Sequence, residues 1–216
     1  MKTKEWVIVL MAGLMSAVST PGLAQRDDNS IDETPEDGWS SSFSVSTYLA
    51  QHGRDFANPV VSADHGGLHL EARYNYEALK TGSVWAGYNL AFGNQLAFEA
   101  TPMLGLVFGD STGLAPGYNL VVSYGRVELF TQGEYFFDAG THSGNFFYSW
   151  SELSYAPADW VRFGMVVDRT KVLGSGLEVR RGPLLGFSHK AFDFTTYWLD
   201  PGSTDATFVF SVTLNF

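Results

Sequence analysis

The sequence contains no cysteine among its 216 residues. This absence excludes disulfide bonds, metal sites built from thiolates, and a lipid anchor on an N-terminal cysteine. Beyond the N-terminal region, no segment holds the roughly 18 uninterrupted apolar residues that a transmembrane helix requires. Because only helices and closed barrels satisfy the backbone in lipid, a membrane protein built from this chain must be a β-barrel. A soluble exported β-sandwich is the alternative.

Charged residues are also scarce, at 17% of the chain, and acidic residues outnumber basic ones by 23 to 13. The resulting net charge of −10 argues against nucleic acid as a partner. Aromatic residues, in contrast, make up 15% of the chain, and glycine occurs 23 times. This composition is typical of alternating β-strands with lipid-facing aromatic girdles.

The N-terminal region predicts export. Lys2 and Lys4 precede an apolar run, and Gly22 and Ala24 supply the small residues of a signal-peptidase site. We therefore predict a secretory signal peptide over residues 1–24, with an N-terminal membrane anchor as the alternative. Residues 25–38 hold six acidic side chains and one arginine, and are expected to form a disordered periplasmic segment.

From residue 39 onward, apolar and polar residues alternate with the period of two that indicates β-strands. The last strand places its apolar side chains on one face and mostly polar ones on the other, and it ends on Phe216. Twelve strands are predicted in all, or ten if a hairpin is misread. They span residues 39–50, 57–64, 68–77, 83–92, 95–108, 114–124, 127–138, 145–156, 160–169, 177–189, 192–199 and 206–216.

The lengths of the connections support twelve strands. Counted back from the C-terminus, alternate connections have only two or three residues, and the others have five to seven. Outer-membrane barrels show this parity, with short periplasmic turns, longer outer loops and both termini in the periplasm. We predict an all-β protein in which residues 39–216 form a transmembrane antiparallel up-and-down β-barrel. Outward aromatics should form girdles at both ends, with Tyr76 among those beside the longer loops.

Two resemblances agree with this fold. The strand over 206–216 resembles the C-terminal signal of outer-membrane barrels, which the barrel-assembly machinery reads. The chain also resembles an uncharacterised family of Gram-negative outer-membrane β-barrel proteins over most of its mature length, in residues 68–77, 87–93, 101–109, 115–119, 144–155 and 192–198. This resemblance implies fold and location, with no functional residue to carry over. We expect a monomer in outer-membrane lipid and lipopolysaccharide, without a cofactor.

The inward faces of the strands carry the candidate functional residues, which would line a pore or form a salt-bridge network: His69, Glu71, Arg73, Asn89, Glu99, Glu128, Glu134, Glu152, Arg162 and Arg180. One hypothesis places Glu71, Glu99 and Glu128 on an acidic wall opposite Arg162 and Arg180, which would set a field across the lumen as in diffusion porins. The alternative is that these charges pair and plug the barrel, because buried charge must be compensated.

An enzyme is the third reading. Ser149 and Ser151 are expected to face lipid, where an outer-membrane phospholipase would place its nucleophile, but no histidine lies at matching depth. His69 and Glu71 share a face at i and i+2, which ordinary lumen hydrogen bonding explains. The sequence shows no metal-ligand spacing or nucleotide motif.

Small monomeric porins for acidic sugars are similar in size and strand number, but have strongly basic lumens. The acid-rich lumen expected here favours a narrow passive channel for small polar or cationic solutes.

Overall fold

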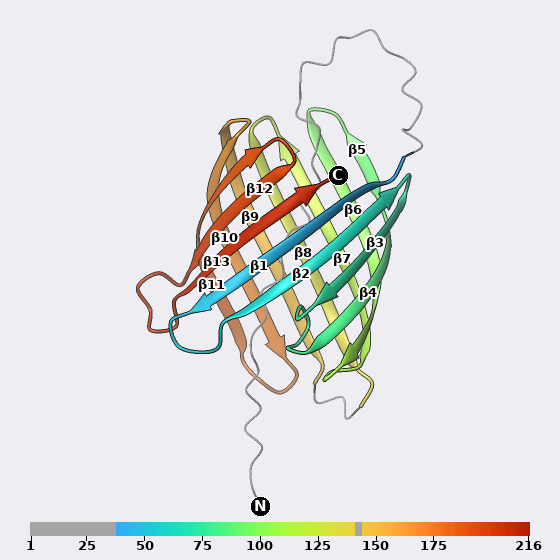
Figure 1. Ribbon diagram of the computed structural model, residues 1–216, viewed down its shortest axis with the longest axis vertical. Helices are drawn as coiled ribbons and strands as arrows, with labels where there is room; N and C mark the ends of the chain where they lie inside the picture. Colours follow the sequence, from blue (N-terminus) through green and yellow to red (C-terminus); the bar gives the residue numbers. More distant parts are fainter. Residues whose placement is uncertain (1–37, 141–143) are drawn as a thin grey trace, which may run out of the picture.

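The computed structural model describes residues 38–140 and 144–216, which form thirteen strand segments in one closed antiparallel sheet (Figure 1). The predicted signal peptide (1–24) and the acidic segment (25–38), except Gly38, lie outside the described residues. The segments are β1 (Ser40–Ala50), β2 (Phe56–His65), β3 (Leu68–Tyr74), β4 (Thr81–Tyr88), β5 (Leu90–Gly93), β6 (Leu96–Gly109), β7 (Gly113–Tyr124), β8 (Val127–Asp138), β9 (Phe146–Ala158), β10 (Val161–Val172), β11 (Leu177–His189), β12 (Phe192–Leu199) and β13 (Thr207–Asn215).

The first and last strands close the barrel. β1 and β13 pair antiparallel from Ser42 opposite Asn215 to Ala50 opposite Thr207. The other strands pair with their neighbours in the sequence, except that β4 pairs with β6 because the short β5 pairs with β6 alone. The predicted up-and-down antiparallel barrel is therefore confirmed.

The strand predicted over 83–92 consists of two segments, β4 and β5. Both keep one register against β6, because Gly87 lies opposite Met103 and, three residues on, Leu90 lies opposite Ala100. β5 extends past the end of β3 and pairs with β6 alone. The barrel thus has the twelve strands predicted, and β5 is a short extra segment. The ten-stranded alternative is wrong.

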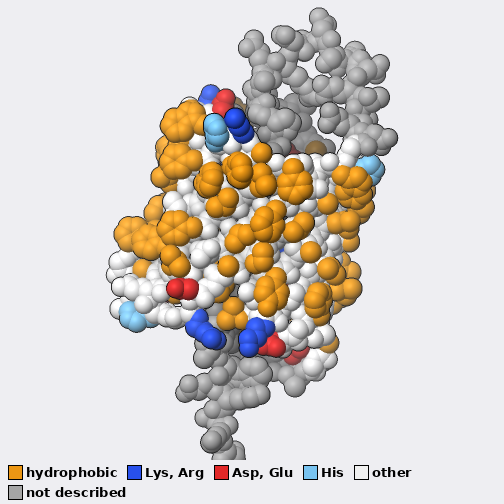
Figure 2. Space-filling view, in the orientation of Figure 1, with side chains coloured by type: hydrophobic (Ala, Val, Ile, Leu, Met, Phe, Trp, Pro, Cys, Tyr) orange, Lys and Arg blue, Asp and Glu red, His pale blue; other side chains and the backbone are white. Residues whose placement is uncertain are grey.

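The exterior of the barrel is apolar. Along β6, Leu104, Leu106 and Phe108 are about half exposed (49, 58 and 53%), whereas Met103 and Val107, on the opposite face, are nearly buried (7 and 3%). Figure 2 shows hydrophobic side chains over the middle of the visible face and charged ones mainly near its two ends. Among the described residues, no helix is long and apolar enough to cross a membrane, a finding that does not bear on crossing by strands.

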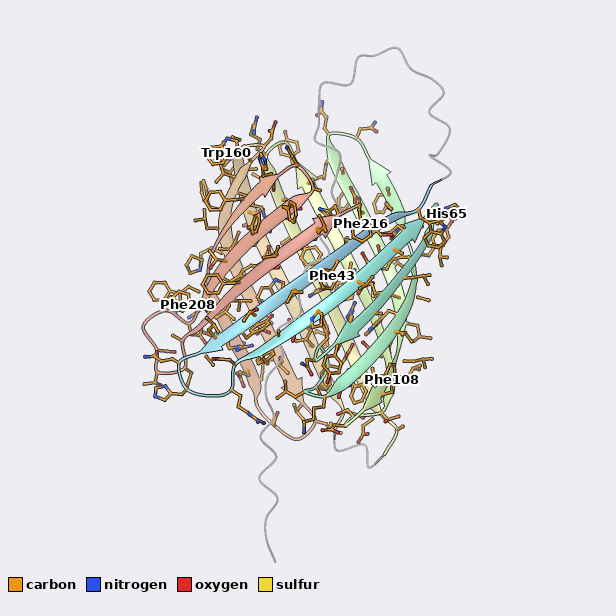
Figure 3. All side chains as sticks on the ribbon, in the orientation of Figure 1. Phe43, His65, Phe108, Trp160, Phe208 and Phe216 are labelled. Carbon is orange, nitrogen blue, oxygen red and sulfur yellow. The ribbon has the colours of Figure 1, made fainter. Side chains whose placement is uncertain are left out.

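The two ends of the barrel differ as the connection lengths predict. His65, Trp160 and Phe216 lie at the end with the short turns, and Phe108 and Phe208 lie toward the end with the longer connections (Figure 3). Aromatic side chains therefore occur near both ends of the apolar surface, where interfacial girdles are expected.

The strand predicted over 68–77 ends early, which makes the girdle assignment of Tyr76 wrong. β3 stops at Tyr74, and Asn75 adopts a left-handed φ of 55°. Asparagine tolerates this conformation better than most residues other than glycine. The reversal turns Tyr76 into the barrel, where its side chain is only 3% exposed.

Candidate functional site

The ten predicted lumen residues occupy inward-facing positions at different depths. Five are almost completely buried: His69, Glu71, Arg73, Glu134 and Glu152. The other five are partly exposed: Asn89, Glu99, Glu128, Arg162 and Arg180. The alternation of the strands accounts for this placement, because successive side chains point to opposite faces of the sheet.

The first charged cluster surrounds Arg73 on β3. Its Nε donates to Glu71 Oε2 at 2.6 Å, and its Nη1 lies 3.4 Å from Glu134 Oε2 on β8. The guanidinium also lies 4.3 Å from the ring centroids of both Tyr76 and Trp85. Arg73 is thus held by two carboxylates and two aromatic faces, an arrangement that favours guanidinium over ammonium.

A hydrogen-bonded chain extends this cluster toward the short-turn end. His69 Nε2 lies 2.7 Å from Glu71 Oε1, and His69 Nδ1 lies 2.7 Å from Asp64 Oδ1. An imidazolium, with a proton on each nitrogen, satisfies both carboxylates at once. Asn89 then donates to Asp64 at 2.6 Å and accepts from Thr101 at 2.7 Å.

The second cluster surrounds the fully buried Glu152 on β9. Trp150 Nε1 and the Tyr197 hydroxyl donate to its Oε1 at 2.7 and 2.8 Å. Arg162 Nη1 donates to its Oε2 at 3.1 Å, and Arg162 Nη2 donates to the Thr195 hydroxyl at 2.9 Å. The carboxylate therefore has both a cationic partner and neutral donors, as a buried charge requires.

The arginines do not form a basic wall, so the hypothesis of a field between opposite walls is wrong. Arg162 pairs with Glu152, and Arg180 pairs with Asp168 at 2.6 Å. The third lumen arginine, Arg73, lies on the wall that was expected to be acidic. The pairs of Arg162 and Arg180 join neighbouring strands, whereas Arg73 pairs with Glu71 on its own strand and with Glu134 across the interior. Each arginine is thus compensated locally.

Two carboxylates of the lumen differ from the rest. Glu99 on β6 and Glu128 on β8 are partly exposed, and neither forms an ion pair with a cation among the residues that the structure describes. Both lie near the short-turn end of their strands. The lumen therefore keeps an excess of negative charge at this end.

Aromatic side chains narrow the lumen on the side of the longer connections. The rings of Trp150 and Tyr197 meet edge to face with centroids 5.1 Å apart, and those of Tyr76 and Tyr148 do so at 6.2 Å. These four belong to one cluster of buried side chains. Twelve strands give a backbone diameter of roughly 24 Å, and these rings occupy part of that width.

Three residues of the Arg73 cluster were not among the candidates: Tyr76, Glu77 and Trp85. Glu77 lies in the connection between β3 and β4, and its Oε1 accepts from the Ser83 hydroxyl at 2.5 Å and from Trp85 Nε1 at 3.2 Å. Its burial raises the pKa of Glu77 above the ordinary value, while the nearby Arg73 opposes this rise. The available sequence signal was Asn75, a residue type that often ends a strand by adopting positive φ.

The described residues offer little support for catalysis or metal binding. No group of three His, Cys, Asp or Glu side chains among them is placed to hold a metal ion. Ser151 shares a hydrogen bond of 3.0 Å with Thr131, and both nitrogens of His69 are engaged by carboxylates. These contacts are those of a structural network.

Trp85 depends on glycines in the neighbouring strands. A Cβ on Gly105 would overlap the indole ring, and one on Gly117 would lie 3.0 Å from it.

We expect Gly105→Ala to displace Trp85 from Arg73 and to lower the free energy of unfolding by about 1–3 kcal/mol. The free energy of unfolding is measured by incubating the protein in increasing urea and following the fraction that still migrates as the folded band on a gel. Gly176→Ala, where an added Cβ meets no atom within 4 Å, is the control; an equal loss in both variants would contradict the account.

A closed twelve-stranded antiparallel barrel with an apolar exterior and a charged interior defines the porin-like class of β-barrels. No protein-family model matches the chain, and no curated protein matches it in sequence. Among solved structures, the KdgM porin is similar, with 11% identity and a TM-score of 0.59 over 81% of this chain and 99% of KdgM. The KdgM porin in complex with disordered oligogalacturonate gives 10% identity and the same TM-score and coverage. These likenesses show the fold.

Proposed function

We propose that the protein is a narrow passive channel of the bacterial outer membrane for small polar or cationic solutes. The observation that carries this proposal is the charge imbalance of the lumen. Arg73, Arg162 and Arg180 are each paired with a carboxylate, whereas Glu99 and Glu128 form no ion pair among the described residues. Carboxylates that line a low-dielectric passage without a close ion-pair partner attract cations and repel anions.

The apolar exterior supports the membrane location. Its aromatic ends fit a bilayer flanked by two interfaces, and the short-turn end would face the periplasm. In this proposal the predicted signal peptide directs export, and the terminal strand is read by the barrel-assembly machinery. The barrel then acts as a monomer among outer-membrane lipid and lipopolysaccharide.

The solute class proposed here differs from the one named for the similar porin. One KdgM structure contains oligogalacturonate, which is a polyanion. The acid-rich lumen of this chain would repel such a ligand, because Glu99 and Glu128 add negative charge at one entrance. Neutral and cationic solutes of amino-acid size are the better candidates.

A closed barrel with a structural or ligand-holding interior is the second candidate function. The observation that favours it is the buried network around Arg73 and Glu152, together with the aromatic cluster in the lumen. Side chains packed in this way can stabilise a barrel without leaving a continuous passage. A transport measurement separates the two candidates.

Swelling of liposomes that contain the refolded protein provides this measurement. Vesicles are placed in isotonic solutions of cationic, neutral or anionic amino acids of similar size. We expect fastest swelling with the cationic solute and slowest with the anionic one, because the lumen carboxylates discriminate by charge. Swelling at the rate of empty liposomes with every solute, from protein shown to be inserted, would favour the closed barrel.

Embedding in lipid has a test of its own. Leu104 lies midway along β6 and faces outward, 49% exposed. We expect Leu104→Arg to destabilise the barrel folded in vesicles by about 2–4 kcal/mol, because arginine is costly at the bilayer midplane. Tyr124→Arg, at the short-turn end of β7, should cost only about 0–1 kcal/mol. Equal costs at the two positions would contradict the proposed depth of the barrel.

A further inference from the structure

The connection between β3 and β4, residues 75–80, differs from the exposed connections at the same end of the barrel. Tyr76 and Glu77 are 3% and 5% exposed, whereas residues 51–55 and 173–176 are fully on the surface. A connection normally runs over the surface because its backbone needs water as a partner. Burial of two large side chains in a short connection therefore requires a structural reason.

The backbone of this connection is fixed in an inward-folded shape. Asn75 and Lys80 both adopt left-handed conformations, with φ of 55° and 58°. The Asn75 N–H donates to the Thr81 carbonyl at 2.8 Å, and the Lys80 N–H donates to Asn75 Oδ1 at 2.8 Å. Asn75 Nδ2 donates to the Ala57 carbonyl on β2 at 3.1 Å, which ties the connection to the barrel wall. These bonds satisfy the backbone without exposing it.

The side chains of the connection reach across the lumen. The Tyr76 ring covers the Arg73 guanidinium at 4.3 Å and meets the Tyr148 ring on β9 with centroids 6.2 Å apart. Around the sheet, β3 and β9 are separated by β4, β6, β7 and β8. The Tyr76–Tyr148 contact is therefore a bridge across the interior of the barrel.

Glu77 adds a carboxyl group beside this bridge. Its Oε1 accepts hydrogen bonds from Ser83 and Trp85, while its buried Oε2 has no hydrogen-bond partner among the described residues. Arg73 is already paired with Glu71 and Glu134, so Glu77 brings a third carboxyl group to one guanidinium. A passing cation would meet carboxyl oxygens at this narrowing, including one that no donor of the described residues occupies.

We propose that residues 75–80 form an inward-folded constriction of the lumen, in which Tyr76 sets the width and Glu77 adds to the preference for cations. This inference rests on the proposed channel function. Rings and carboxylates at the narrowest point of a pore decide which solutes pass. The exposed connections at residues 51–55 and 173–176 would have little influence on the conductance.

The test is single-channel conductance of the full barrel with a shortened connection. Replacing residues 76–79 by two glycines removes both side chains, and replacing residues 173–176 by two glycines is the matched control. We expect the first variant to raise the conductance by about twofold or more and the control to leave it unchanged. If the shortened barrel folds poorly, Tyr76→Ala is the alternative variant, because it keeps the connection at full length. It should raise the conductance by a smaller factor.

The possible outcomes separate this inference from the proposed function. A conducting wild type with unchanged conductance in the shortened and Tyr76→Ala variants overturns the constriction and leaves the channel intact. Silence from both wild type and shortened barrel, each shown to be folded and inserted, overturns the channel itself. If the wild type is silent and the shortened variant conducts, the constriction is supported, and it closes the pore of the wild type completely.

The absence of native cysteine permits a second readout. In Glu77→Cys, a cationic methanethiosulfonate reagent adds positive charge at the proposed narrowing. We expect modification to lower the cation conductance severalfold, because the new charge repels permeating cations. The control is Ser175→Cys in the exposed connection. Two results would contradict the placement of Glu77 in the pore. One is an equal change of current at the two positions, and the other is an unchanged current after the thiol at position 77 has been modified.

Discussion

Arg73→Ala is expected to lower the free energy of unfolding by about 3–5 kcal/mol, the largest loss we anticipate for a single lumen substitution. The side chain of Arg73 is 5% exposed, and its guanidinium pairs with Glu71 and Glu134, whose side chains are each 3% exposed. Its removal leaves buried Glu134 without a cation and leaves Glu71 with His69 alone. An uncompensated buried charge is far more costly than a lost contact. Urea titration of the folded fraction in lipid vesicles measures the change.

Two further variants show whether charge compensation is the cause. Adding Glu134→Gln to Arg73→Ala should restore part of the lost stability, because one of the unpaired charges disappears. The surface control is Arg126→Ala, since Arg126 and its partner Asp159 have side chains 53% and 96% exposed. This pair should contribute no more than about 1 kcal/mol. Similar losses for Arg73→Ala and Arg126→Ala would mean that the buried network does not stabilise the barrel.

Glu99→Lys combined with Glu128→Lys is expected to reverse the ion preference of the channel. The change replaces by ammonium groups the two lumen carboxylates that form no ion pair among the residues that the structure describes. The short-turn entrance therefore becomes positive. The reversal potential in a potassium chloride gradient should therefore change sign. The neutral pair Glu99→Gln with Glu128→Gln should give an intermediate value.

Asp159→Lys is the control for this charge reversal. Asp159 lies in a turn at the same end of the barrel but has a fully solvated side chain, 96% exposed. Salt screens a charge in that position over about 10 Å at 0.1 M ionic strength, so its effect on selectivity should be small. An equal shift from the turn and from the lumen would show that surface charge, and not the lining of the passage, sets the preference.

Much of the barrel could be predicted from the sequence because lipid and lumen impose opposite chemistry on alternate residues. The pattern Phe208, Phe210, Val212 against polar neighbours identifies the last strand. The parity of short and long connections, in turn, fixes the number of strands at twelve. A strand as weak as β2, which contains Pro59, is recovered by this parity.

The partners within the lumen could not be predicted in the same way. Arg73 and Glu134 lie four strands apart in the sheet, and their contact depends on strand tilt and on side-chain length across the interior. The inward fold of the connection was also hidden, because the alternation of residue types continues through Tyr76 and Glu77 while the backbone leaves the strand at Asn75. A local change of φ leaves no trace in a pattern of period two.

The most direct test of the proposed channel is the reversal potential of the refolded wild-type barrel in a planar bilayer with a tenfold potassium chloride gradient. We expect steady ohmic steps and a reversal potential of the sign that denotes cation preference, because carboxylates of the lumen exceed its cations. Silence from protein shown to be inserted, or a reversal potential that denotes anion preference, would contradict an acid-lined channel.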